Sequence, residues 1–463
     1  MVSSSRFRAS LVLTVVLAGV AYVVAALCLI VLTWDGAGYV FNSIERGRPA
    51  IPNGRYSDYP FLCVVSLLSR VISDPLWLAG IYGLVLALLP LGSLLLSFDF
   101  LSGSQLRPLR IWPVLGILLS VLPGQAFFVA EAVPLVQVSW ALWAIVAAEI
   151  SHWSLVWLAV LSAFLFFLHP TAALTYGATG GLFLAKAAWA TRQRGLATWL
   201  GLAFLVLTIL RLWYALATAN SYERGEESLT QNYQAFCSAL PSIGILPFVY
   251  LLGLTVLGAV TGQIPNRLTN WLSGLLLGLL VVYGLVWAAD PRLWVGAFSF
   301  RRFELVGTLP LLVLGVLHWR YGNRVGDNKR RSASSPTDSA SASYGATSWI
   351  MLGSAAAFLL VFTTQAFSWR EELSRFQADL RRCDKPVATI DDLPWVPGTP
   401  LNHWASTPLS CVIQGRKVKT LFALHAADVS ERKVLLFPGT WFRTRNRWFE
   451  LELSEKEQGI DSR

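Results

Sequence analysis

Charged residues are scarce in this chain. Of its 463 residues, 14% are Asp, Glu, Lys or Arg, whereas a soluble domain carries about 25%. The chain is also 55% hydrophobic and contains 20 Trp and 25 Phe. This deficit of charge excludes an ordinary soluble domain and places the chain in the membrane class. We therefore interpret the net charge of +10 as a record of membrane orientation, with no nucleic acid as partner.

Nucleotide and metal motifs are absent from the sequence. No phosphate-binding GxxxxGK[S/T] loop and no GxGxxG after a strand occurs, which removes the usual signals of an ATPase or a dinucleotide enzyme. The five cysteines form no CxxC pair, so a zinc site is not indicated.

Long apolar runs follow one another up to residue 367. Because about 20 apolar residues cross a bilayer, we expect an α-helical polytopic membrane protein with about 11 transmembrane helices. The first run is too long for a usual signal-peptide core, and we interpret it as a retained helix. The expected spans lie near residues 10–32, 76–97, 111–130, 135–150, 154–168, 171–190, 196–218, 243–262, 270–288, 304–318 and 348–367.

Basic residues indicate the orientation of these spans. If the N-terminus is cytoplasmic, most of the cytoplasmic connections carry Lys or Arg, as the positive-inside rule requires. The longest of them is the linker 319–347, whose Ser/Ala-rich part we expect to be disordered. Residues 1–367 then form a transmembrane domain, and 368–463 form a small extracytoplasmic domain of α+β or β type. The compact loops favour a bacterial inner membrane.

The first outer loop, residues 33–60, concentrates charged and aromatic side chains. A substrate with a sugar and a phosphate would suit such a set, and the alternative is an ordinary solvated connector. The candidates in it are Trp34, Asp35, Arg55, Asp58 and Tyr59.

The other outer loops extend this one-sided distribution. A random arrangement would scatter such residues over both faces, so we expect an active cavity that opens outward. Residues 61–73 follow the first loop and are candidates for a helix that lies in the membrane interface. The further candidates in the outer loops are Glu131, His169, Arg292, Arg301 and Arg302.

Each candidate carboxylate has a functional and a structural interpretation. Asp35 is well placed as a general base, or it caps a helix that starts at Gly36. Asp58 is a second carboxylate, a metal ligand or a cap. Glu131 lies among apolar residues, so it needs a partner or stays protonated. We treat all three as candidate catalytic residues.

The candidate cations are open to two interpretations as well. Arg211 lies inside an expected span, where an arginine costs at least ~2.5–3.5 kcal/mol unless it is paired or faces water. It is a phosphate clamp or part of an ion pair, or it snorkels to the span end. The arginines at 292, 301 and 302 hold a lipid phosphate or anchor headgroups. His169 is an acid/base or phosphate donor, or a satisfied interfacial histidine.

Cysteine usage gives one further expectation. Cys383 and Cys411 are the two cysteines of the C-terminal region. On the outer face such an isolated pair fits one disulfide in an oxidising compartment.

The layout resembles the GT-C superfamily of polytopic membrane glycosyltransferases. The shared features are the number of spans, the cytoplasmic N-terminus, the C-terminal outer domain and an acidic residue soon after the first span, which is Asp35 in the stretch TWDG. Gly36 stands where that family usually has a second acidic residue, which leaves the use of a divalent cation open.

The resemblance implies a hexosyl- or pentosyltransferase. It would move a sugar from a polyprenyl-phosphate donor, held among membrane lipids, to a glycan, lipid or protein acceptor on the outer face. Asp35 would be the catalytic base, and Arg211 or the arginines of 292–302 would hold the donor phosphate.

Two other classes of function stay open. A transporter or flippase of a lipid-linked or polar solute would also need embedded charges and a broken helix, such as one near His169-Pro170. The absence of an obvious internal repeat and the one-sided polar residues count against it. A non-catalytic membrane assembly factor would explain an outer domain but not Arg211.

Overall fold

The structure, a computed structural model, is mostly helical. It describes residues 2–49, 56–103, 105–127, 129, 132–189, 193–218, 237, 241, 243–261, 263–294, 304–331, 337–385, 387–402, 405–423 and 449–451. Within these ranges, five helices are long and apolar enough to cross a membrane: Arg8–Leu27, Pro75–Phe100, Arg194–Thr218, Arg267–Ala289 and Thr347–Arg382. Such helices are compatible with an integral membrane protein.

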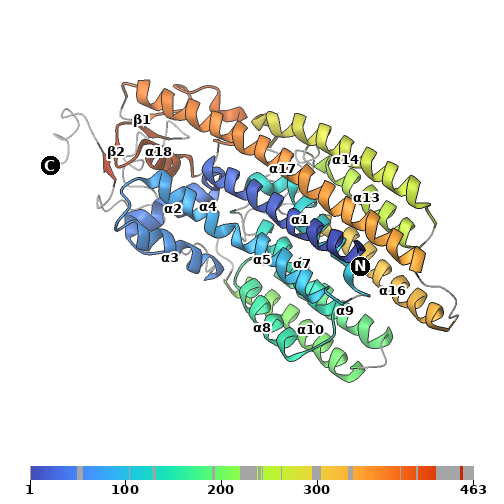
Figure 1. Cartoon of the computed structure of the whole chain (residues 1–463). Helices are drawn as coiled ribbons and strands as arrows, with labels where there is room; N and C mark the ends of the chain where they lie inside the picture. Colours follow the sequence, from blue (N-terminus) through green and yellow to red (C-terminus); the bar gives the residue numbers. More distant parts are fainter. Residues whose placement is uncertain are drawn as a thin grey trace.

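The long helices run side by side as a bundle (Figure 1). They coincide with the apolar runs of the sequence, because only a helix satisfies its own backbone in an apolar environment. Their bounds are α1 (Val2–Leu27), α4 (Pro75–Leu86), α5 (Leu88–Phe100), α7 (Ala132–Ala147), α8 (His152–Phe166), α9 (Ala172–Trp189), α10 (Arg194–Thr218), α13 (Leu246–Val260), α14 (Asn266–Ala289), α16 (Glu304–Arg331) and α17 (Thr337–Arg382).

Helix α17 is the longest element and lies between α1 and α14 (Figure 1). Against α1 it packs aromatic rings, with the centroid of Tyr22 at 5.6 Å from Phe358 and 5.5 Å from Phe362. Against α14 it packs closely because Gly284 has no side chain, and a Cβ there would lie 2.6 Å from Val361. These contacts bury one side of α17, while side chains such as Trp349 and Phe367 on its other side are exposed.

The expected linker 319–347 is shorter than predicted. Helix α16 continues to Arg331 and α17 starts at Thr337, while residues 332–336 lie outside the described ranges. Helix α17 also passes without a break through residue 367, where the sequence suggests a domain boundary.

The chain leaves α1 through a tight left-handed turn. Leu29 has φ 61° and Trp34 has φ 48°, and between them lies the short 3-10 helix η1 (Ile30–Leu32). The indole of Trp369 donates a hydrogen bond of 2.9 Å to the carbonyl oxygen of Leu29, which ties this turn to α17. A Cβ on Gly36 would lie 1.7 Å from the carbonyl oxygen of Val31, so only glycine fits there.

Most of the expected outer loop 33–60 is helical. Helix α2 (Asp35–Arg46) begins directly after Trp34, and the 3-10 helix η3 (Tyr56–Asp58) leads into α3 (Tyr59–Leu68). Residues 35–45 of α2 are all buried, which a solvated connector would not be. The sequence does not indicate this helix clearly, because charged residues stand at both ends of its apolar positions.

The expected span 111–130 is a broken segment and not one helix. It consists of α6 (Ile111–Val114), the π-helix η5 (Leu115–Leu119) and the 3-10 helix η6 (Leu122–Phe127). The ring of Trp140 lies on Gly116, where a Cβ would be 1.9 Å from it. Single π-helical turns are frequent at functional sites, and this one is buried in the centre of the bundle.

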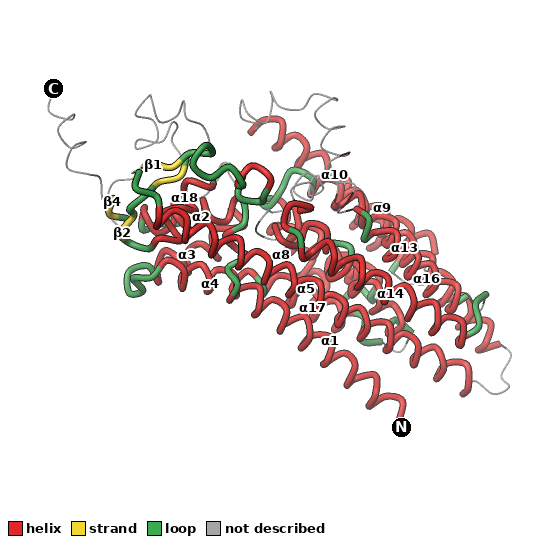
Figure 2. Tube along the Cα trace, turned by 90° about the horizontal axis from the view of Figure 1, so that it is seen from above, coloured by secondary structure: helices red, strands yellow, loops and turns green. Residues whose placement is uncertain are grey.

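The C-terminal residues pack against α2 at one end of the bundle (Figure 2). Helix α18 (Ser406–Gln414) contacts α2, and the Phe449 ring stacks on Phe41 at 4.9 Å. Two parallel strand pairs complete this part, β1 (Val387–Ala388) with β3 (Leu421–Phe422) and β2 (Lys417–Val418) with β4 (Glu450–Leu451). We call this end of the bundle, where α2, α3 and α18 lie, the Asp35 end.

The predicted disulfide between Cys383 and Cys411 is wrong for this structure, in which both are free cysteines. Cys411 lies on the buried face of α18, and Cys383 is partly exposed just after the last residue of α17. Burial raises the pKa of the Cys411 thiol to about 12.

Replacing Gly36 by Ala tests the tight turn. The new methyl group would overlap the Val31 carbonyl, so we expect G36A to destabilise the protein by about 1–3 kcal/mol and to lower its Tm by several degrees. The control is Gly181→Ala in α9, where a Cβ meets nothing within 4 Å and where we expect equal or greater stability. Thermal unfolding in detergent, followed by intrinsic fluorescence, compares the two; equal effects would contradict the close approach.

Thiol labelling tests the cysteines. A maleimide at pH 8 should modify Cys383 and leave Cys411 unmodified in the folded protein, because the reagent needs an accessible thiolate. Peptide mapping by mass spectrometry, with and without prior reduction, measures both sites. A disulfide-linked 383–411 peptide in the unreduced sample would contradict the free thiols.

Candidate functional site

Arg211 lies at the centre of a buried aromatic corner. Its side chain is 4% exposed although the rest of α10 is largely exposed. The guanidinium carbon lies 5.3 Å from the ring centroid of Tyr214 and 5.7 Å from that of Phe166, at the end of α8. These rings attract a cation through their faces, so Arg211 is held inside the protein and does not extend to solvent.

The segment with Asp58 reaches this same corner. The Ser57 hydroxyl donates to the Phe164 carbonyl at 2.5 Å, and the Tyr56 ring lies 6.0 Å from Phe167. Asp58 itself is 5% exposed. The structure therefore brings the beginning of α3 and the ends of α8 and α10 together. We call this set of residues (Asp58, Phe164, Phe166, Arg211 and Tyr214) the Arg211 corner.

We do not assign His169 or Tyr59 to the Arg211 corner. His169 lies in the turn between α8 and α9, where its Nδ1 accepts from the Thr171 amide at 3.3 Å and pairs with the Thr171 hydroxyl at 2.7 Å. That geometry fits the interpretation of a satisfied histidine. Tyr59 is the first residue of α3 and is exposed.

An apolar groove of ≈ 560 Å³ leads away from the Asp58 segment. Its walls come from the start of α3, from α5, α7 and α8, and they include Phe61, Leu89, Leu96, Val138, Leu161 and Phe164. Leu88, Leu95 and Val160 along it are exposed, so the groove opens at the side of the bundle. Its volume lies within the range of about 300–1,000 Å³ that small-molecule sites occupy.

Asp35 lies at the same end of the bundle, on α2, which packs against α3. It is the first residue of α2, is 7% exposed, and follows the strained Trp34. A carboxylate in the first helical turn is stabilised by the helix dipole. The neighbouring Gly36 approaches both Val31 and Val129. Asp35 is therefore the first residue within α2, while Trp34 stands at the N-cap without a side-chain cap bond, so the helix begins one residue earlier than a cap at Asp35 would place it.

Arg292 is already engaged by a neighbour. In the 3-10 helix η7 (Pro291–Trp294) its Nε and Nη2 donate to the two oxygens of Asp290 at 2.9 and 3.0 Å. This fork holds the pKa of the Asp290 carboxyl below its ordinary value. The Arg292 side chain is 73% exposed, which fits a surface pair worth little to stability.

Four predicted site residues lie outside the described ranges: Arg55, Glu131, Arg301 and Arg302. In the part of the chain that is described, no three His, Cys, Asp or Glu side chains lie close enough to hold a metal ion.

Two buried glutamines, one within the broken segment and one on α7, form a network that the sequence analysis does not predict. Gln125 and Gln137 donate to the hydroxyl of Tyr22 at 3.2 and 3.0 Å, and Gln137 also reaches the Ile117 carbonyl at 3.4 Å. The only signal in the sequence is an amide within an apolar run. This network joins α1 to η5 and η6, and it satisfies a backbone that has left helical geometry.

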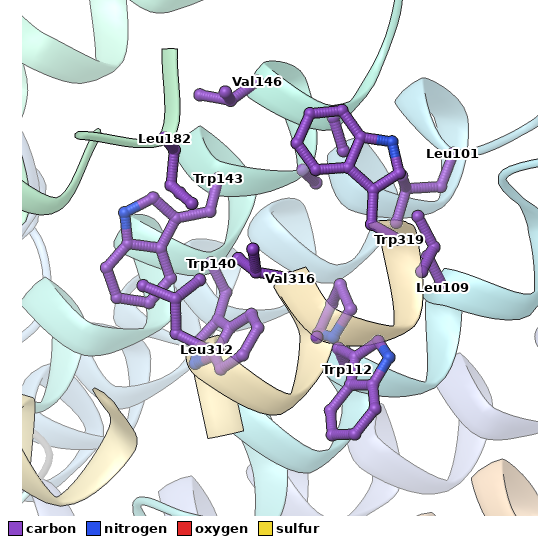
Figure 3. A pocket seen from close by; sticks show the side chains of 14 residues that line it. Leu101, Leu109, Trp112, Trp140, Trp143, Val146, Leu182, Leu312, Val316 and Trp319 are labelled. Carbon is purple, nitrogen blue, oxygen red and sulfur yellow. The ribbon is translucent and has the colours of Figure 1, made fainter. Parts of the chain in front are cut away.

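A second, smaller cavity of ≈ 50 Å³ is lined by tryptophans (Figure 3). Trp112, Trp140, Trp143 and Trp319 surround it, together with leucines and valines from α7, α9 and α16 and with Leu101 and Leu109 from the connection that follows α5. The indole N–H of Trp112 donates to His318. The indole of Trp140 donates to Thr308, and that of Trp143 donates to Thr179. Its volume lies far below the range of about 300–1,000 Å³ that small-molecule sites occupy, so we assign this cavity to the scaffold.

Comparison with known protein families, with characterised proteins and with solved structures finds no match to this chain. What can be said of its function therefore depends on the groove, on the Arg211 corner with Asp58, and on buried Asp35.

Proposed function

We propose that the chain is an integral membrane glycosyltransferase of GT-C type that uses a polyprenyl-phosphate sugar donor. The observation that carries the proposal is the apolar groove, which opens sideways and ends beside buried Asp58 and the Arg211 corner. A lipid-linked sugar has the matching shape, with an apolar tail, a phosphate and then a sugar.

The topology proposed with it follows from the sequence. The N-terminus is cytoplasmic, about 11 helices cross a bacterial inner membrane, and the Asp35 end with the C-terminal residues is extracytoplasmic. The described basic residues Arg107, Arg110, Arg194, Arg267 and Arg320 flank the helix ends that this orientation places inside, as the positive-inside rule favours.

The groove suits the tail of the donor. Its walls along α5 and α8 are mostly aliphatic and aromatic, with Ser93 and Asp99 as the polar members, and its side opening lets a lipid enter from the bilayer. Burial of a methylene group contributes about 0.8 kcal/mol, so a few isoprene units supply much of the affinity. The protein then needs few polar contacts to hold the donor.

In the proposed reaction Asp35 acts as the base, and Arg211 is the cation beside the phosphate. The acceptor hydroxyl gives its proton to the Asp35 carboxylate while its oxygen bonds to the anomeric carbon of the sugar. The bond from that carbon to the phosphate oxygen breaks, and polyprenyl phosphate leaves with the electron pair. Arg211 stabilises the negative charge that grows on the leaving phosphate, and Asp58 is the second carboxylate at the reacting end.

One observation favours a second candidate, a transporter or flippase of a lipid-linked solute. The broken segment α6–η5–η6 lies in the centre of the bundle and carries a buried polar network. Discontinuous helices of this kind form the binding sites of many transporters.

Carboxamide variants test the proposed base. Purified protein in liposomes should consume radiolabelled polyprenyl-phosphate sugars, and Asp35→Asn should reduce the rate at least 100-fold, the scale of a general base. Asp58→Asn should also lose activity. The matched control is Asp74→Asn at the exposed cap of α4, where Asn also caps a helix and activity should stay unchanged.

The outcome separates the two candidates. If wild-type liposomes consume no donor but move lipid-linked sugar across the bilayer, the transferase proposal is wrong and the transporter takes its place. If Asp35→Asn remains fully active while Asp58→Asn is inactive, the base is misassigned.

Filling the groove tests its role in holding the tail. Gly92 lines the groove, and a Cβ there meets nothing within 4 Å, so Gly92→Phe places a ring in the groove without a backbone clash. We expect at least a tenfold higher KM for a long-chain donor and a much smaller change for a donor with one or two isoprene units. Gly274→Phe in α14, equally open and outside the groove, is the control. Equal KM changes for both donors would show that the tail binds elsewhere.

A further inference from the structure

The apolar groove of ≈ 560 Å³ follows α5, α7 and α8. Helix α4 contacts α2 and α18 at the Asp35 end, and α5 continues the chain from α4, so Leu88 lies toward that end and Asp99 lies away from it. Helix α8 runs the other way, with Trp157 before Phe164. Val138 of α7 lines the groove between them, and α7 contacts both α5 and α8. The groove therefore has two ends, one near Asp58 and one remote from it.

The two ends differ in chemistry. At the near end the ring of Phe61 meets the ring of Phe164 edge to face, with centroids 6.4 Å apart, and Phe61 follows Asp58 by about one helical turn. At the remote end Asp99 is exposed and attracts the guanidinium of Arg110. A carboxylate loses favourable hydration when an apolar group covers it. A hydrocarbon chain that follows the groove therefore stops or turns aside at Asp99.

The helical rise gives the length of the groove. On α5 the lining residues run from Leu88 to Asp99, which is about 16 Å at about 1.5 Å per residue. On α8 they run from Phe164 to Trp157, which is about 10 Å. An extended isoprene unit contributes four carbon–carbon bonds and is about 5 Å long. Both walls thus enclose about two units, and α5 extends along about one more.

A longer tail has a place to leave. Leu95 of α5 and Val160 of α8 are exposed at the side of the groove, shortly before Asp99. A tail of about eight units is about 40 Å long when extended, which exceeds the groove and also the hydrocarbon core of about 30 Å. Most of such a tail must therefore lie in the bilayer, and the opening beside Leu95 and Val160 leads there.

We propose that the groove binds only the first three isoprene units of the polyprenyl tail, and that Gly92 and Asp99 are the residues that set this limit. Gly92 leaves the middle of the groove open, since a Cβ there meets nothing within 4 Å. Asp99 closes the remote end to hydrocarbon. The identity of the occupant as a polyprenyl phosphate rests on the proposed function, whereas the length limit rests on the groove itself.

Native mass spectrometry tests the limit without requiring turnover. The full chain is released from phospholipid nanodiscs that contain polyprenyl phosphates of one to eight isoprene units at equal mole fractions, and the bound mass identifies the lipid. Bilayer lipid is as apolar as the groove, so any preference comes from packing contacts and not from the hydrophobic effect. The bound fraction should rise about threefold with each unit up to three and change by less than twofold from four to eight.

Two variants should move the limit in opposite directions. Gly92→Phe fills the groove about 6 Å past Leu88, so binding should level off at one or two units. Asp99→Leu replaces the charged end by an apolar one, so a fourth unit should bind about threefold better than a third. Misfolding cannot produce this gain. The matched controls are Asp99→Asn, which keeps a polar end, and Gly274→Phe, which lies on α14 outside the groove; both should level off at three units.

Several results would overturn the length limit. These are binding that keeps rising up to eight units, binding that is independent of length from one unit onward, a bound phospholipid that no polyprenyl phosphate displaces, and a Gly92→Phe variant that behaves like Gly274→Phe. Donor consumption that depends on Asp35, without a levelling-off at three units, overturns the limit alone. Binding that levels off at three units, without donor consumption by the wild type, overturns the transferase alone.

Discussion

A hydrogen bond between the first and the last long helix holds the Asp35 end together. Trp369 of α17 donates to the carbonyl of Leu29, the residue where α1 turns into left-handed backbone. A non-glycine residue in that region costs of order 1–3 kcal/mol, and a donor to its buried carbonyl offsets part of this. The turn directs the chain into α2. The orientation of Asp35 therefore depends on a contact between Leu29 and Trp369, which are 340 residues apart in sequence.

The broken segment in the core obeys the same rule of satisfied polar groups. Backbone that leaves helical geometry inside an apolar environment must find other partners. Gln137 reaches the carbonyl of Ile117, and Ser120 bonds back to Gly116 at 2.7 Å and lies 3.3 Å from the Thr308 hydroxyl. Where this rule is obeyed, the polar residues are scaffold.

Apolar runs and helix signals give the helical elements from sequence, because spanning length and hydropathy depend on composition alone. The helix after the first span has a local signal, since Asp35 is a residue type that caps helices, and the structure starts α2 at Asp35 with Trp34 at the N-cap. The broken segment has none, because the ring of Trp140 that lies on Gly116 comes from another helix. The missing disulfide also depends on packing, since the buried face of α18 cannot be read from the spacing of Cys383 and Cys411.

The magnitude of the Arg211 interactions decides how that residue is interpreted. An arginine within a span costs at least ~2.5–3.5 kcal/mol, while each aromatic ring contributes about 0.5–2 kcal/mol to a cation beside it. Two rings, Phe166 and Tyr214, therefore offset about 1–4 kcal/mol of this cost without any phosphate. The burial of Arg211 is thus not by itself an argument for a substrate. The apolar groove differs, because the described side chains leave its ≈ 560 Å³ unfilled and its opening exposes Leu88, Leu95 and Val160. A lipid-linked substrate would cover that surface and place its phosphate near the arginine, so the groove, and not the arginine, carries the functional argument.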